Sequence, residues 1–99
     1  MPGGFTTATP TGVVVVCSEE RWAIDEAKHV VLTGRAEAVR DSVADPIEIR
    51  RSRHDPNVWL CYRRDKTRLL CAVIQSDAGR LITAYPADGM KQGDLIWKP

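Results

Sequence analysis

The chain has 99 residues, of which 43% are hydrophobic and 27% are charged, and its formal net charge is +1 at pH 7. These values are typical of one soluble globular domain, and a net charge of +1 is not by itself the signature of a nucleic-acid-binding protein. The apolar run GVVVVC, residues 12–17, is much shorter than the about 18 residues that a membrane helix needs. We therefore expect a cytoplasmic protein with no membrane partner.

The chain divides into two parts. We expect residues 1–12 to form a flexible leader and residues 13–99 to form a single domain. The leader, MPGGFTTATPTG, has neither the basic start nor the apolar stretch of a secretory signal. The run of valines that follows it predicts a first strand.

Two short helices, or one helix bent at Gly34, are predicted between residues 19 and 44. Ser18 is a candidate N-cap, and acidic residues follow it in the first turn. The dipeptide Asp45–Pro46 ends the second helix, because the residue before a proline avoids helical dihedrals. Two apolar stripes follow from helical spacing, the first made of Ile24, Ala27, Val30 and Val31 and the second of Leu32, Ala36, Val39 and Val43.

From Pro46 onward, apolar residues alternate with a period of two. This pattern predicts four strands, at residues 47–52, 57–64, 68–75 and 80–85. The connections RHDP, RDKT and SDAG are short and polar, so consecutive antiparallel hairpins are expected. The predicted fold class is α+β, with N-terminal helices packed on a four-stranded antiparallel meander.

Three cysteines, Cys17, Cys61 and Cys71, lie in apolar segments and form no CxxC pair. They are expected to be buried free thiols, and with only two histidines they do not make an ordinary zinc site. The chain also lacks a glycine-rich phosphate loop, HExxH and GxSxG. No metal or cofactor is expected, which leaves metal-free phosphoryl transfer as a possible chemistry.

Positive charge is concentrated in the second half of the chain. Residues 1–49 carry four basic and eight acidic side chains, whereas residues 50–99 carry ten basic and five acidic ones. Seven of the fourteen Lys and Arg lie between Arg50 and Arg68. Their guanidinium groups suit phosphate oxygens, and Trp59 and Tyr62 could stack bases; the alternative is a solvated, charged strand pair.

Further candidate site residues lie at the end of the first helix and in the last predicted strand. His29 lies where a helix dipole favours the imidazolium, and it is either a titratable site group or a surface residue. Strand alternation places Leu81, Thr83 and Tyr85 on one face, and Arg80, Ile82 and Ala84 on the other. Thr83 and Tyr85 are also ordinary strand formers. Lys91 follows a turn and either folds over their face or points into water.

Five motifs occur in a recognisable order over about residues 19–97. They are KHVVL (28–32), ADPIEIRRSRHDP (44–56), VWLCYRR (58–64), LITAYPADGMKQG (81–93) and LIW (95–97). In this order the chain resembles a family of small phage- and plasmid-associated bacterial proteins of the barnase, EndoU, colicin-tRNase and RelE-like ribonuclease fold. The resemblance implies a RelE/barnase-like domain.

The resemblance also implies a function. It points to a metal-independent endoribonuclease, such as a toxin of a toxin–antitoxin pair or a phage effector, that cleaves RNA by attack of the 2′-OH. RNA and an antitoxin or immunity protein would be its partners. The implied catalytic residues are His29, Arg51, Arg63, Thr83, Tyr85 and Lys91. The implied RNA-binding residues are Arg50, Ser52, Arg53, Arg64, Lys66 and Arg68.

Two alternatives remain open. Ala23 and Ile24 stand where such proteins often carry a second helix histidine. The chain is then a catalytically silent module of the same fold that binds RNA or protein, or a small structural or adaptor protein of a mobile element. The spatial separation of His29, Arg63 and Tyr85 discriminates between these interpretations.

Overall fold

The computed structural model describes residues 3–90 and 93–99, and in these residues the strands form one seven-stranded sheet. The strands are β1 (Phe5–Ala8), β2 (Val14–Cys17), β3 (Glu48–Arg51), β4 (Val58–Asp65), β5 (Arg68–Gln75), β6 (Arg80–Ala87) and β7 (Asp94–Trp97). Their order across the sheet is β1-β2-β6-β5-β4-β3-β7. Strands β2 and β6 pair in parallel at Val16 and Arg80, and the other neighbours pair antiparallel.

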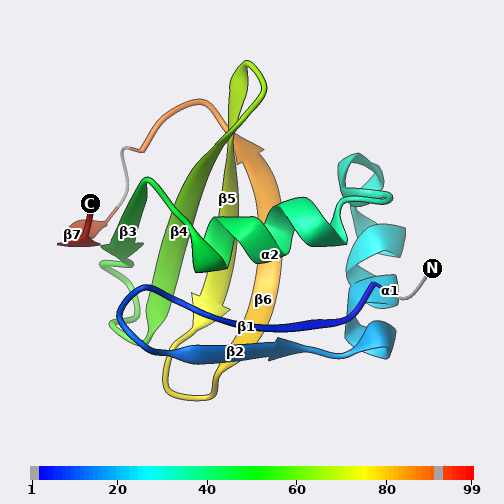
Figure 1. The fold of residues 1–99 in the computed structure, drawn as a ribbon, viewed down its shortest axis with the longest axis horizontal. Coiled ribbons are helices and arrows are strands. Elements are labelled where there is room, and N and C mark those ends of the chain that lie inside the picture. Colours follow the sequence, from blue (N-terminus) through cyan, green and yellow to red (C-terminus); the bar gives the residue numbers. More distant parts are fainter. Residues whose placement is uncertain (1–2, 91–92) are drawn as a thin grey trace.

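The helices are α1 (Glu19–Lys28), the 3₁₀ helix η1 (Val30–Leu32) and α2 (Ala36–Ala44). Figure 1 shows α2 crossing one face of the sheet in front of β4, β5 and β6, with the β1–β2 hairpin running beside it. Because α2 contacts β4, β5 and β1, the sheet curls around this helix. Helix α1 lies beside β6, where Arg21 Nη2 donates to the Ile82 carbonyl at 3.2 Å. No helix in the described part of the chain is long and apolar enough to cross a membrane.

Apolar side chains pack on both faces of the sheet, because strand residues alternate between them. The α2-face core lies between the sheet and the helices and contains Val15, Cys17, Trp22, Leu32, Val39, Val43, Ile49, Cys61, Leu70, Ala72, Ile74, Leu81 and Ala84. The opposite face is called the Tyr62 face. Its smaller core contains Leu60, Tyr62, Cys71 and Val73.

The predicted fold class is wrong. The four-stranded meander exists as β3–β6, but it forms only the middle of a mixed seven-stranded sheet. A meander of four strands would leave the backbone groups of β6 unpaired along its outer edge, and β2 pairs with the start of that edge. Part of the expected leader is also ordered, since Phe5–Ala8 forms β1 and pairs with β2.

The apolar stripe predicted for the first helix is wrong as well. Ile24, Val30 and Val31 are 47%, 82% and 60% exposed, whereas Trp22 is 2% exposed. The helix ends at Lys28 because His29 adopts extended backbone dihedrals, and η1 then directs the two valines outward. The stripe of the second helix is confirmed by the burial of Leu32, Val39 and Val43, and all three cysteines are buried free thiols as predicted.

Candidate nucleic-acid interface

The predicted site residues Thr83 and Tyr85 both lie on the Tyr62 face. Thr83 pairs with Val73, and Tyr85 pairs with Cys71. The predicted alternation fails earlier in β6, where the pairing with β5 shifts by one residue. Because Ile82 is the extra residue of this bulge, Leu81 packs in the α2-face core and Ile82 packs on the Tyr62 face.

Arg51 and Arg63 lie on the α2 face instead. Arg63 is opposite Leu70 of the α2-face core, and its Nη1 donates to the carbonyl and the Oδ2 of Asp45 at 2.7 and 2.9 Å. Arg51 is opposite Trp59 and lies near the β7 edge. The two arginines and the Thr83–Tyr85 pair are therefore on opposite faces of one sheet and do not converge on a common phosphate.

His29 is the C-cap of α1 and is exposed. Its backbone N–H donates to the Asp25 carbonyl at 3.0 Å. In residues 3–90 and 93–99, no hydrogen bond or ion pair joins it to Arg63 or Tyr85. Lys91 lies outside the described residues.

Asp25, one helical turn before His29, is 3% exposed. Its Oδ2 has no hydrogen-bond partner within the described residues, and Oδ1 is 3.8 Å from Arg21 Nε. Burial raises the pKa of Asp25 above its ordinary value of 3.8, although Arg21, His29 and Lys28 oppose the shift. At neutral pH the charged Asp25 carboxylate therefore destabilises the native state.

We expect Asp25→Asn to raise the free energy of unfolding at pH 7 by about 1 kcal/mol, because it removes a buried charge with an unsatisfied oxygen. The native pKa is raised, so the carboxyl favours folding below about pH 3.8, and this contribution is lost as the pH rises through the native pKa. The gain should vanish near pH 3. Urea unfolding at both pH values measures it, with the exposed Glu20→Gln as control; an equal gain at pH 3 would contradict the explanation.

Three side chains form a row across the Tyr62 face. Tyr62 of β4 is paired with Cys71 of β5, and Cys71 is paired with Tyr85 of β6. Burial raises the pKa of Tyr62 to about 12 and the pKa of Cys71 to about 11, and it raises the pKa of Tyr85 as well. At neutral pH the phenols are therefore hydrogen-bond donors and not general bases, and the thiol is un-ionised.

Two of the three arginines at and just after β3, Arg50 and Arg53, have ion pairs within the protein. Arg50 Nε lies 2.7 Å from Glu48 Oε2, and Arg50 Nη1 donates to the Gly93 carbonyl at 3.4 Å. Arg53 Nε lies 3.4 Å from Asp94 Oδ1, and Ser52 Oγ accepts the His54 N–H at 3.1 Å. Of Arg50, Arg51 and Arg53, only Arg51 has no ion pair within the described residues. The Arg50–Glu48 pair is mostly buried, whereas the Arg53–Asp94 pair is exposed and contributes little.

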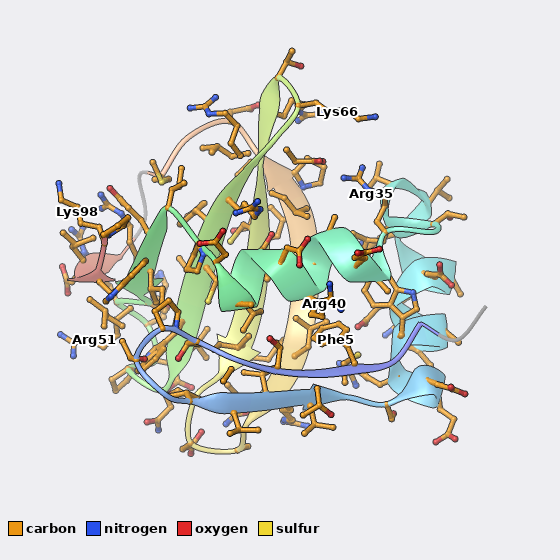
Figure 2. The ribbon with its side chains drawn as sticks, viewed as in Figure 1. Phe5, Arg35, Arg40, Arg51, Lys66 and Lys98 are labelled. Carbon is orange, nitrogen blue, oxygen red and sulfur yellow. The ribbon has the colours of Figure 1, made fainter. Side chains whose placement is uncertain are left out.

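The end of the β4–β5 hairpin presents a second group of predicted RNA-binding residues. Lys66 is in the turn with φ 59°, and Figure 2 shows it at the tip of the hairpin, well separated from Arg51. Within the described residues, Arg64 and Lys66 have no ion pair. Arg68 Nη2 is 3.6 Å from Asp88 Oδ1, and both side chains are exposed.

Three clefts border this hairpin end. The largest, called the η1 cleft, has a volume of about 330 Å³ and lies between η1, the start of α2 and the hairpin; its lining includes Val31, Arg35, Asp65, Lys66, Arg68, Leu69 and Pro86. A second cleft of about 230 Å³ lies toward α2 and includes Arg63, Arg64 and Lys66. A third of about 210 Å³ includes Arg64, Arg68 and Asp88. Arg64, Lys66 and Arg68 each line two of these three clefts, so neighbouring clefts share the same cations.

Comparisons with known proteins identify no family for this chain. No family model, curated protein or solved structure matches this chain. The resemblance to small ribonucleases stays a prediction.

The structure adds residues that the sequence reasoning did not assign to a site. Val31, Leu69 and Pro86 form apolar walls of the η1 cleft, and Arg35 lies at its rim beside Asp65. The helical spacing predicts Val30 and Val31 in a buried stripe, whereas both are exposed. One signal in the sequence argues against a buried helical stripe here: Val30 and Val31 are both β-branched, which lowers helix propensity.

Proposed function

We propose that this protein binds RNA at the end of the β4–β5 hairpin and does not cut it. The observation that supports this proposal is the position of Arg64, Lys66 and Arg68, which line the three clefts around the hairpin. Phosphate contacts supply most of the affinity in non-specific nucleic-acid binding. Adjacent hollows lined by shared cations suit a chain of phosphates better than a single small anion.

The ion pairs of this region do not prevent phosphate binding. Arg68 and Asp88 are 59% and 97% exposed, and exposed pairs contribute only about 0–1 kcal/mol. A phosphate can therefore replace the carboxylate at little cost. Arg64 and Lys66 have no such partner within the described residues, so their charge is available directly.

The arrangement of the implied catalytic residues favours binding over cleavage. General acid–base catalysis needs groups within hydrogen-bond reach of one substrate. Arg51 and Arg63 lie on the α2 face, Thr83 and Tyr85 lie on the Tyr62 face, and His29 ends α1. The proposal includes a cytoplasmic location, because RNA is abundant there.

The test compares two triple variants that remove the same number of cations. Arg64→Ala/Lys66→Ala/Arg68→Ala should weaken binding of a labelled single-stranded RNA at least tenfold in low salt. It should also reduce the slope of log affinity against log salt by about 2, since each lost phosphate contact removes about 0.7. Arg51→Ala/Arg53→Ala/Lys98→Ala, on the β3–β7 side of the sheet, should change affinity less than twofold. Fluorescence anisotropy over a salt series measures both effects.

Two results would overturn the proposal. Equal losses in both triple variants would show that only net charge matters. RNA kept in EDTA with the wild type should stay intact; 2′,3′-cyclic phosphate ends that disappear with His29→Ala would instead establish the metal-independent ribonuclease.

A further inference from the structure

Apolar and cationic side chains together line the η1 cleft. Val31, Leu69 and Pro86 contribute apolar surface, and Arg35, Lys66 and Arg68 stand around it. We propose that this cleft holds one unstacked nucleobase of a single-stranded RNA, with the flanking phosphates on Lys66 and Arg68. The inference rests on the proposed function, because it assigns one nucleotide of the bound strand to a specific hollow.

The size and the exposure of the cleft fit such a ligand. Its volume of about 330 Å³ is at the lower end of the roughly 300–1,000 Å³ range of small-ligand pockets, which suits one ring system. Val31 is 60% exposed although it is a large apolar residue. A base laid against it would remove this apolar surface from water, which is favourable in proportion to the area covered.

The Arg35 guanidinium provides a flat surface for the base. Arg35 is held by its ion pair with Asp65 on the hairpin, whereas Arg68 is assigned to a phosphate. Unstacked bases in RNA complexes commonly stack on arginine planes as well as on aromatic rings. Lys66, by contrast, is a point charge at the hairpin tip and suits a phosphate.

The lining of the η1 cleft also predicts that the cleft does not distinguish among the four bases. Asp65 is already engaged by Arg35, and Thr67 offers only an exposed hydroxyl, so few groups remain to read base edges. Stacking tolerates every base because each has a π-face. We therefore expect a preference for single strands over duplexes, whose bases are already stacked, and little preference among the four bases.

The experiment separates the base from the phosphates. Oligouridylate of about ten nucleotides, within the usual ~4–16 nucleotide site sizes, is compared with a base-free ribose-phosphate chain of equal length and charge. The wild type should bind the base-free chain about tenfold more weakly. A fully paired RNA of the same length should also bind more weakly than oligouridylate.

A pair of adjacent substitutions locates the effect. Val31→Glu places a carboxylate on the wall of the η1 cleft, and Val30→Glu makes the same charge change at an 82% exposed neighbour outside the lining. Both positions are exposed, so both variants should fold, as circular dichroism would show. The tenfold preference for oligouridylate over the base-free chain should fall toward onefold in Val31→Glu and persist in Val30→Glu.

The outcomes distinguish this inference from the proposed function. Equal wild-type affinity for the two chains would overturn base insertion while leaving RNA binding intact. An unchanged preference in Val31→Glu would also overturn it, because the base would then lie elsewhere. If neither chain binds in low salt, the proposed function fails too, and the exposed Val30 and Val31 would point to a protein partner.

Discussion

Replacing Trp22 by alanine should lower the free energy of unfolding by about 3–5 kcal/mol, the usual cost of removing a large aromatic side chain from a core. Trp22 is 2% exposed and is the largest side chain of α1 in the α2-face core. The backbone near the N-terminus closes over it, since a Cβ atom at Gly3 would lie 1.9 Å from Trp22 Cδ1. The cavity left by alanine is therefore bounded by backbone, which limits relaxation.

This loss is large beside the about 5–15 kcal/mol that stabilises a typical domain. Urea unfolding followed by circular dichroism measures it. The control is Ile24→Ala, two residues later on the same helix and 47% exposed, which should change the free energy of unfolding by less than about 0.5 kcal/mol. Both substitutions raise helix propensity, so similar losses in the two variants would contradict the explanation from Trp22 packing.

The elements that could be predicted are those with a sustained pattern. Leu32, Val39 and Val43 recur at helical spacing and all point into the core as expected. The strands β4, β5 and β6 each have eight residues and are rich in β-branched or aromatic side chains, so the meander was visible in the sequence. Local propensity and burial agree in these segments.

The two edge strands carry no comparable signal. β1 and β7 have four residues each, FTTA and DLIW, which is too short to show an alternation. They are strands because their backbone groups pair with those of β2 and β3. This pairing exists only in the assembled sheet. The parallel contact of β2 with β6 is likewise a pairing between residues far apart in sequence, Val16 and Arg80.

The candidate site was less predictable than the fold for the same reason. The bulge at Ile82 moves Leu81 to the other face, and no turn residue marks it. Arg63 pairs with Asp45, which is 18 residues earlier, so its contacts cannot be judged from the neighbouring residues in the sequence. The hairpin cations Arg64, Lys66 and Arg68 are close together in sequence and line neighbouring clefts in the structure, apart from the other predicted RNA-binding residues.

The junction of β2 and β6 depends on one glycine, and Gly79→Ala should cost about 2–4 kcal/mol. Gly79 has φ +65°, where an L-residue loses about 1–2 kcal/mol, and an added Cβ would lie 2.6 Å from the Val14 carbonyl oxygen. That oxygen belongs to the backbone of β2, so the strand itself must shift. The shift would strain the hydrogen bond from Val16 N–H to the Gly79 carbonyl, 2.9 Å long, which adds about 1 kcal/mol.

Gly34→Ala separates the two contributions to this cost. Gly34 has a similar φ of +70°, but nothing lies within 4 Å of its added Cβ, so only the backbone term of about 1–2 kcal/mol applies. Urea unfolding compares the two variants, and hydrogen exchange at the Val16 amide should speed up in Gly79→Ala alone. Equal losses would mean that the contact with Val14 relaxes without cost. A larger loss in Gly79→Ala, with faster exchange at Val16, would show that this close approach holds the N-terminal hairpin to the sheet.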